Sequence, residues 1–140
     1  MFDDRYETRL ANWREFRDSL ESSNTPFEDL VNLYNKAPLV SRHTDPWDKK
    51  SWPNPWELIS ENEYCDFSCV LGMCYSLQLT ERFKDANFEI HISIDRTKSS
   101  TYYLLYVNDV VIGYEDSIIN KNDLSADVIS QRMYEMSPVQ

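Results

Sequence analysis

The sequence predicts an α+β fold with N-terminal helices, a central helix packed on a small antiparallel sheet, and a C-terminal helix. Three observations carry this prediction. Apolar residues recur at three- and four-residue spacing up to about residue 83, the period changes to two at Phe88, and helical spacing returns after residue 123. The chain has 140 residues, of which 41% are hydrophobic, so it is long enough to bury a core as one compact molecule.

Two helices are expected at the N-terminus, over residues 4–21 and 26–36. The first carries a stripe of large apolar side chains on one face and charged side chains on the other. Thr25 and Pro26 are typical of an N-cap and a first helical residue, and Pro38 ends the second helix. We therefore assign residues 1–37 to an N-terminal helical extension.

Residues 38–140 are assigned to the α+β core. The core begins with a connector, residues 38–55, that holds four of the six prolines and shows no sustained period. Asn54 is expected to cap a short helix that starts at Pro55, and a longer central helix is expected over residues 65–83. The tryptophans of this region should fasten the connector to the core, with Trp52 and Trp56 buried against the central helix and Trp47 more exposed.

The second half of the core reads as an antiparallel meander. Strands are expected over residues 88–95, 101–108 and 110–115, the last two joined as a hairpin. In the first strand the isoleucines alternate with polar residues, so His91 should lie on the face opposite to Ile90. The spacing of apolar residues in "DLSADVISQRMYEM" predicts the C-terminal helix.

Composition excludes several classes of function. The net charge is −10 and lysine and arginine form no cluster, which argues against direct binding of nucleic acid. The acidic excess indicates a solvated surface, or one acidic face that docks a basic partner. The apolar runs are too short to span a membrane, and the N-terminus has no signal-peptide pattern, so we expect a protein that is not secreted by a signal peptide.

No metal or cofactor is expected. The chain has only two glycines, which argues against a glycine-rich phosphate loop. Its three cysteines, Cys65, Cys69 and Cys74, have no second Cys pair or His pair at zinc-finger spacing. An odd number of cysteines without a signal peptide also argues against a disulfide framework.

One stretch resembles a known enzyme family. The segment "WPNPWELISENEYCDFSCVLG", residues 52–72, precedes the predicted sheet and resembles the core of transglutaminase-like and papain-like cysteine enzymes. The resemblance covers residues 52–115 and implies that Cys65 is a nucleophile at a helix N-terminus. It also implies a histidine base on a later strand and an Asp or Asn that orients the histidine.

The supporting positions depart from the family pattern. Residues 100–102 and 112–114, where the histidine and the acid would lie, contain neither, and Glu63 and Tyr64 replace the usual Gly-Asp before the cysteine. His91 should face away from the helix layer, and His43 lies in the connector. We therefore expect a pseudoenzyme in which Cys65 packs as a small apolar side chain. The alternative is a cysteine hydrolase or acyltransferase that uses Cys65.

The remaining candidates are surface residues for protein contacts. Arg9, Trp13 and Arg17 stand four apart in the first helix, and tryptophan and arginine are enriched at interface hot spots. Trp47 in the connector is a further interface candidate for the same reason. In general character the chain also resembles small proteins from the virion-gene region of tailed phages. That resemblance implies a non-catalytic virion component at the neck or capsid, located in the virion or the host cytoplasm. A modulator of a host protein is a further alternative.

Overall fold

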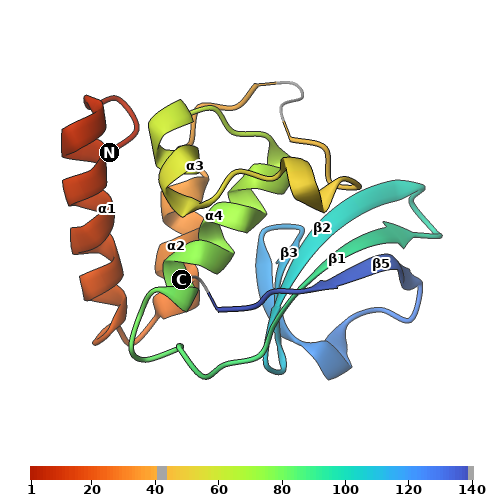
Figure 1. Cartoon of the computed structure of the whole chain (residues 1–140). Coiled ribbons are helices and arrows are strands. Elements are labelled where there is room, and N and C mark those ends of the chain that lie inside the picture. Colours follow the sequence, from red (N-terminus) through yellow and green to blue (C-terminus); the bar gives the residue numbers. More distant parts are fainter. Residues whose placement is uncertain (41–43, 139–140) are drawn as a thin grey trace. The chain divides into compact units, whose positions relative to one another are not determined.

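The computed structural model of the protein describes residues 1–40 and 44–138, and it confirms the α+β class (Figure 1). The chain forms two compact units, residues 1–84 and residues 85–140. The first unit contains the helices α1 (Tyr6–Leu20), α2 (Pro26–Tyr34), η1 (Lys49–Ser51), α3 (Pro55–Glu61) and α4 (Asp66–Gln78). The predicted boundary between residues 37 and 38 stays a prediction; in the structure, α1 contacts α3 and α4, and α2 contacts α4.

Ser76 on α4 joins the two N-terminal helices in the first unit. Its Oγ accepts a 2.9 Å hydrogen bond from the buried indole Nε1 of Trp13 on α1. The same oxygen lies 3.2 Å from the hydroxyl of Tyr34 on α2. One turn earlier, Gly72 allows the ring of Tyr34 to approach closely, because a Cβ atom at this position would lie 2.5 Å from the ring. The helices α1, α2 and α4 thus meet at the Ser76 hydroxyl, a buried polar group among apolar side chains.

The ends of the helices differ in part from the predictions. Asn54 and Glu57 form the predicted capping box at the start of α3. Thr25 occupies the N-cap position of α2, but its hydroxyl donates to Asp29 instead of accepting from the helix backbone. Helix α4 ends at Gln78 and not near residue 83, because the carboxylate of Glu21 accepts the backbone N–H groups of residues 81 and 82 that a longer helix would use.

The second unit is a five-stranded antiparallel sheet in the order β4-β3-β2-β1-β5. Its strands are β1 (Phe88–Asp95), β2 (Ser100–Val107), β3 (Val110–Tyr114), β4 (Ser117–Asn120) and β5 (Val128–Glu135), and η2 (Lys121–Asp123) follows β4. The predicted C-terminal helix is wrong: those residues form β5, which pairs along nearly the whole of β1. The central helix α4 lies in the first unit and the sheet forms the second. Their predicted packing against each other therefore stays a prediction.

The tryptophans also differ from their predicted burial. Trp47 is 58% exposed, as expected, but Trp56 is 43% exposed, so its predicted burial is wrong. Trp52 is half-buried, with its ring centroid 4.9 Å from that of Phe67 and its Nε1 donating to the carbonyl of Asp45. Within the described ranges, no helix combines the length and apolar character that a membrane span needs.

Candidate interaction site

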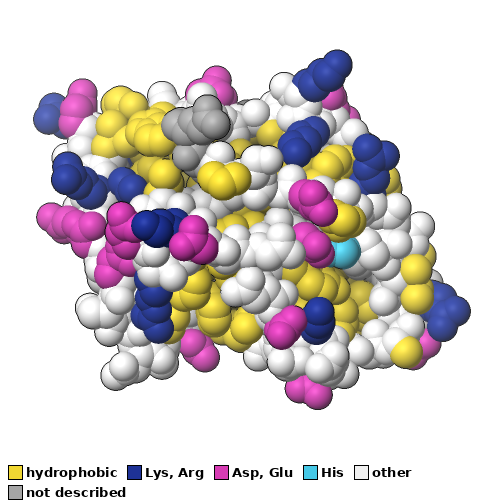
Figure 2. Space-filling model, turned by 60° about the horizontal axis from the view of Figure 1, so that its bottom comes forward, with side chains coloured by type: hydrophobic (Ala, Val, Ile, Leu, Met, Phe, Trp, Pro, Cys, Tyr) yellow, Lys and Arg dark blue, Asp and Glu magenta, His cyan; other side chains and the backbone are white. Residues whose placement is uncertain are grey.

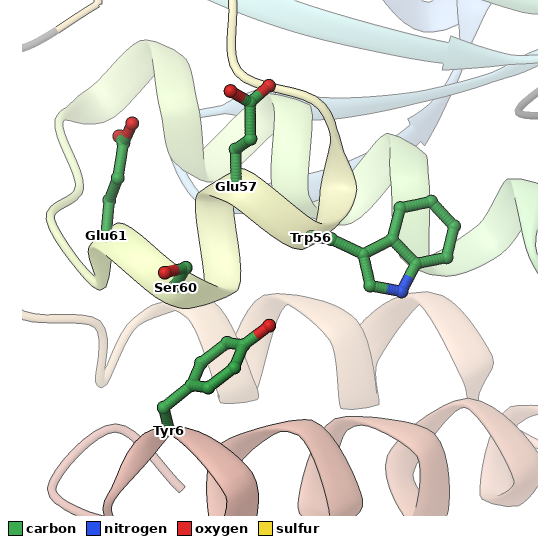
Figure 3. A pocket seen from close by; sticks show the side chains of 5 residues that line it. All are labelled: Tyr6, Trp56, Glu57, Ser60 and Glu61. Atoms are coloured by element: carbon green, nitrogen blue, oxygen red, sulfur yellow. The ribbon is translucent and has the colours of Figure 1, made fainter.

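A pocket of about 380 Å³ opens on the first unit between α1 and α3 (Figure 3). Five residues line it: Tyr6 from α1, and Trp56, Glu57, Ser60 and Glu61 from α3. Tyr6 reaches from α1 toward α3, and Glu57 and Glu61 leave α3 on its other side. The pocket therefore has aromatic side chains from both helices, and the carboxylates of its two glutamates point to the side of α3 away from Tyr6.

The sequence of α3 explains why these side chains point outward. Pro55, Leu58 and Ile59 are buried and mark the inner face of the short helix. Because a helix turns once in about 3.6 residues, positions 56, 57, 60 and 61 then fall on the outer face. The spacing Trp56–Ser60 and Glu57–Glu61 places each pair one turn apart on that face.

The indole of Trp56 is held in place by the residue beneath it. Trp56 meets the buried Trp13 edge to face, with ring centroids 6.5 Å apart and an interplanar angle of 84°. Tyr6, on the other wall, is 37% exposed. Both rings thus present surface to solvent, and Trp56 does so from a fixed position, which is typical of interface residues.

Arg9, one of the predicted interface residues, donates hydrogen bonds to the backbone of α3. Its Nε and one terminal nitrogen donate to the carbonyl of Ile59 at 3.2 and 3.1 Å, and the terminal nitrogen also reaches the carbonyl of Ser60 at 3.1 Å. The other terminal nitrogen donates to the carbonyl of Asp4. The carbonyls of Ile59 and Ser60 lie in the last turn of α3, where a cation is favourable. Arg9 therefore ties α1 to α3 beside the pocket.

The other predicted interface residues lie in different surroundings. Trp13 is 1% exposed, so its indole is not accessible to a partner. The guanidinium of Arg17 lies 4.3 Å from the centroid of the Trp13 ring, and its desolvation lowers its pKa below the ordinary value. Trp47 alone of the predicted set is widely exposed. The predicted Arg-Trp-Arg stripe is thus mostly an internal arrangement.

Cys65 is the N-cap of α4 and is buried, as predicted. Its Sγ lies 3.3 Å from the hydroxyl oxygen of Ser68, and the same oxygen accepts the Cys65 backbone N–H at 2.8 Å. Burial, the negative charge of Asp66 and the neighbouring Cys65 raise the pKa of Cys69 to about 12. His43, weighed as a partner for Cys65, lies outside the described residues.

His91, in the second unit, stands between a hydroxyl and a carboxylate. Its Nδ1 lies 2.7 Å from Ser130 Oγ on β5, and its Nε2 lies 2.9 Å from Glu89 Oε1 on its own strand. The imidazole also stacks on Tyr106, with centroids 4.2 Å apart. Sequence reasoning missed Ser130, because it placed this residue on a helix. A serine hydrolase has the same order of hydroxyl, imidazole and carboxylate, but there Nε2 meets the serine and Nδ1 the carboxylate, whereas here the two ring nitrogens are exchanged.

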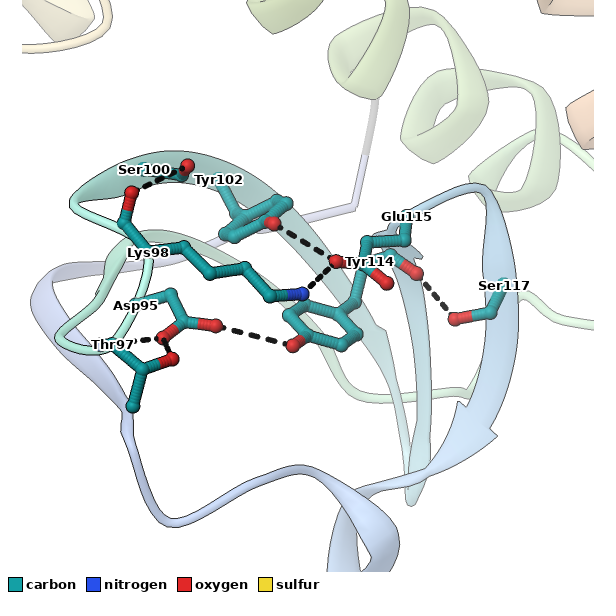
Figure 4. A network of polar contacts seen from close by, with 8 residues as sticks. All are labelled: Asp95, Thr97, Lys98, Ser100, Tyr102, Tyr114, Glu115 and Ser117. Atoms are coloured by element: carbon teal, nitrogen blue, oxygen red, sulfur yellow. Dashed lines mark hydrogen bonds and ion pairs between the residues drawn. The ribbon is translucent and has the colours of Figure 1, made fainter.

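A second cluster of polar side chains joins the β1–β2 hairpin to the end of β3, where the β3–β4 hairpin turns (Figure 4). Lys98 and Tyr102, from the β1–β2 hairpin, both bond to the Glu115 carboxylate that follows β3. Asp95 accepts from Thr97 and from Tyr114. Since these side chains satisfy one another, the group fastens the two hairpins together.

Charge over the surface is mixed. On the face displayed in Figure 2, Asp and Glu side chains lie among Lys and Arg, with hydrophobic side chains between them. Among the residues that the structure describes, no group of three His, Cys, Asp or Glu is placed to hold a metal ion. Comparison with models of protein families and with curated protein sequences found no match. The likeness to cysteine enzymes and to phage proteins therefore stays a prediction.

Proposed function

We propose that the protein is a non-catalytic interaction protein that contacts a protein partner through the pocket between α1 and α3. The observation that carries this proposal is Trp56, which exposes 43% of its surface at the wall of the pocket. A tryptophan buries a large apolar area when a partner covers it, and it is among the residues most enriched at hot spots. Trp47, at 58% exposure, adds a second such side chain to the same unit.

The environment of Cys65 supports a non-catalytic role. A cysteine nucleophile has to meet its substrate, yet Cys65 is only 8% exposed. Its Sγ lies beside the hydroxyl of Ser68, which also takes the N–H group of the N-cap. That bond is a capping interaction of the kind that starts a helix. The thiol forms the other half of this capping box by accepting the backbone N–H of Ser68, so it has a sufficient structural role.

Ser130, His91 and Glu89 form the strongest catalytic rival. Their contacts can pass a proton from the serine hydroxyl to the imidazole. However, Glu89 is two residues from His91 on the same strand, and Tyr106 stacks on the imidazole. These contacts also brace β1 against β5, which is a structural role for the same side chains.

The test uses the full-length chain in cells that produce it. Partners captured by the wild-type protein are compared with those captured by Trp56→Ala and by Lys50→Ala, a matched surface change outside the pocket. We expect a defined partner that is retained by Lys50→Ala and lost by Trp56→Ala. Equal capture by all three proteins would contradict the proposal.

Activity provides an independent test. We expect no hydrolysis of an activated ester such as p-nitrophenyl acetate above the background of a heat-inactivated sample. Hydrolysis that is removed by Ser130→Ala and His91→Ala, or by Cys65→Ser, would replace the proposal with an enzyme. A virion component and a binder of a host protein are the two forms of the interaction proposal, and the identity of the captured partner separates them.

A further inference from the structure

We propose that Ser130 on β5 is a nucleophilic hydroxyl that takes up an acyl group from an activated donor of the thioester class, with His91 as its base. This inference goes beyond the proposed interaction function, because it concerns the second unit and not the pocket between α1 and α3. Uptake of one group per chain is a modification and not turnover, so the two proposals are independent. Three observations carry it: the hydrogen bonds of His91, a bulge in β5 and the exposure of Ser130.

The hydrogen bonds of His91 leave one ring nitrogen as a proton acceptor. Glu89 Oε1 lies 2.9 Å from Nε2, and a carboxylate oxygen only accepts, so Nε2 carries the ring proton. Nδ1 of the neutral imidazole then offers its lone pair to the hydroxyl of Ser130, whose Oγ lies 2.7 Å away. The same hydroxyl lies 3.4 Å from the carbonyl of Arg132, which is the longer and weaker of its two contacts. Ser130 therefore donates its proton to a base.

The exchange of the two ring nitrogens relative to a serine hydrolase does not alter this proton path. Either nitrogen of an imidazole can accept a proton while the other donates one. A nucleophile requires a base within about 2.6–3.2 Å and a group that orients the base, and His91 and Glu89 meet both conditions. The ring of Tyr106 lies against the imidazole, with centroids 4.2 Å apart, and limits its rotation.

A bulge in β5 brings Ser130 to the side of the sheet on which His91 lies. His91 pairs with Met133, so these two side chains share one face. By strict alternation from Met133, Ser130 would lie on the opposite face. The pairing with β1 shifts, however, and leaves Gln131 as an extra residue, so Ser130 lies opposite Ser93 and on the face of His91. Bulges are over-represented next to active sites, where they redirect a side chain in this way.

Ser130 is accessible to a reagent, whereas its base is shielded. Ser130 is an exposed residue, and β5 is the last strand of the sheet beside β1. The side chains of His91 and Glu89 are only 13% and 25% exposed. An acyl donor can thus approach the hydroxyl without displacing a strand, while the imidazole and the carboxylate keep their geometry.

The proposed transfer is balanced within these groups and the donor. Ser130 Oγ attacks the carbonyl carbon of the thioester and forms a C–O bond, while its proton passes to His91 Nδ1. The C–S bond breaks, and the departing thiolate takes the proton from Nδ1 and leaves as a thiol. Glu89 stabilises the imidazolium between these two events. The acyl group remains on Ser130 as an oxygen ester, which is more stable than the thioester that supplied it.

The experiment treats the full-length protein with two probes, a biotinylated fluorophosphonate and the acetyl thioester of N-acetylcysteamine. The fluorophosphonate forms a P–O bond to a nucleophilic serine and loses fluoride, so it reports the first step alone. Peptide mass spectrometry locates each adduct. We expect one adduct per chain, on Ser130, formed at least about tenfold faster than on Ser51, an exposed serine whose hydroxyl donates to a backbone carbonyl. This preference should disappear in urea-unfolded protein.

Variants separate the base from a structural role. His91→Gln should slow the labelling of Ser130 at least about tenfold, and Ser130→Ala should abolish it. Glu89→Gln keeps an acceptor oxygen but removes the charge that stabilises the imidazolium, so it should slow labelling about threefold or more. Asp127→Asn removes a carboxylate that is 44% exposed just before β5 and is the matched control, which should label like the wild type. Thermal unfolding of each variant shows that the sheet is folded during labelling, and the comparison with Ser51 needs no variant.

Two results would overturn this inference: labelling of Ser130 no faster than that of Ser51, and labelling of Ser130 unchanged by His91→Gln in folded protein. Neither result touches the proposed function, which depends on the capture of a partner through Trp56. Release of more than one equivalent of thiol per chain, removed by Ser130→Ala, would confirm the nucleophile and replace the non-catalytic function with an enzyme. One adduct per chain on Ser130, together with loss of the partner in Trp56→Ala, would support both proposals.

Discussion

The hydroxyl of Tyr114 on β3 donates a hydrogen bond of 3.2 Å to Oδ2 of Asp95 on β1, although β2 lies between these strands (Figure 4). By strict alternation Tyr114 would lie on the same face as Ile112. The pairing of β3 with β4 shifts between these two residues, at Gly113. This bulge turns Tyr114 to the opposite face, where its ring stacks on Tyr102 with centroids 4.9 Å apart.

Gly113→Ala should destabilise the second unit. Gly113 has φ of +112°, which L side chains rarely adopt, and a Cβ atom there would lie 2.7 Å from the carbonyl oxygen of Tyr103. Backbone in a sparsely populated region costs about 1–3 kcal/mol, and the clash adds to this. We expect chemical denaturation to show a loss of that size or more. Faster hydrogen exchange in β2 and β3, with α4 unaffected, would localise it, and an unchanged midpoint would contradict this description of the bulge.

Asp95 should make the second unit sensitive to acid. Its pKa is below the ordinary value, first because the Thr97 hydroxyl donates to the carboxylate and then through the backbone of Thr97 and the hydroxyl of Tyr114. A carboxylate whose pKa is lower in the folded state stabilises that state above its unfolded pKa, about 3.9, and this stabilisation is lost as the pH falls through the folded pKa.

The free energy of unfolding of the wild type should thus decrease more steeply from about pH 5 downward than that of Asp95→Asn. Asparagine keeps the shape of the side chain and an acceptor oxygen, so it isolates the charge. Urea denaturation at a series of pH values measures both slopes. Parallel curves for the two proteins would show that Asp95 does not contribute to acid sensitivity.

The part of the fold set by local pattern could be predicted from the sequence, and the part set by distant pairing could not. The strand at residues 88–95 and the helices α1 and α2 follow periods that the chain itself displays, and α3 follows from the cap at Asn54. The segment of β5 does not display the two-residue period of a strand. Its pairing with β1 shifts between Ile92 and Ser93 and leaves Gln131 as an extra residue. This bulge breaks the two-residue period, and apolar residues then fall at a spacing that imitates a helix.

Trp13 and Trp56 should differ sharply in their contribution to stability. Trp13 is fully buried and bonded to Ser76, so Trp13→Ala should cost about 3–5 kcal/mol, in the range of large buried aromatic residues. Trp56→Ala removes a ring that is 43% exposed and should cost about 1 kcal/mol or less. Thermal and urea denaturation of both variants measure this difference. A cost of 3 kcal/mol or more at Trp56, in the range just given for Trp13, would mean that its ring supports the core.

The candidate site depends on a contact that sequence spacing does not reveal. Tyr6 and Trp56 are 50 positions apart and come together because Arg9 binds the last turn of α3. The outward direction of Trp56 could have been predicted from the buried pattern of Pro55, Leu58 and Ile59 on a short helix. The expectation that a tryptophan is buried outweighed that pattern, since tryptophan is highly buried on average.

Cys69 should be nearly inert to thiol reagents in the folded protein. Its pKa of about 12 compares with about 8.5 for an unperturbed cysteine, so its thiolate fraction at pH 8 is roughly a thousandfold lower. Labelling with iodoacetamide at pH 8, followed by mass spectrometry, should modify Cys69 far more slowly in the native than in the urea-unfolded protein. Equal rates in the two states would show that the helical unit opens readily at this site.

Arg9→Lys should loosen α3 from α1 and disturb the pocket without changing the charge. The guanidinium of Arg9 reaches the carbonyls of Asp4, Ile59 and Ser60 at once, and a lysine ammonium cannot repeat this forked geometry. We expect a loss of about 1–2 kcal/mol in the free energy of unfolding, the size of one or two partly exposed hydrogen bonds. Arg14→Lys, at an exposed position on the same helix, is the matched control and should have little effect. Because Tyr6 and the α3 residues form opposite walls of the pocket, Arg9→Lys should also weaken any binding that depends on Trp56. If stability falls while that binding is unchanged, the α1–α3 contact is structural only and the pocket does not require its present shape.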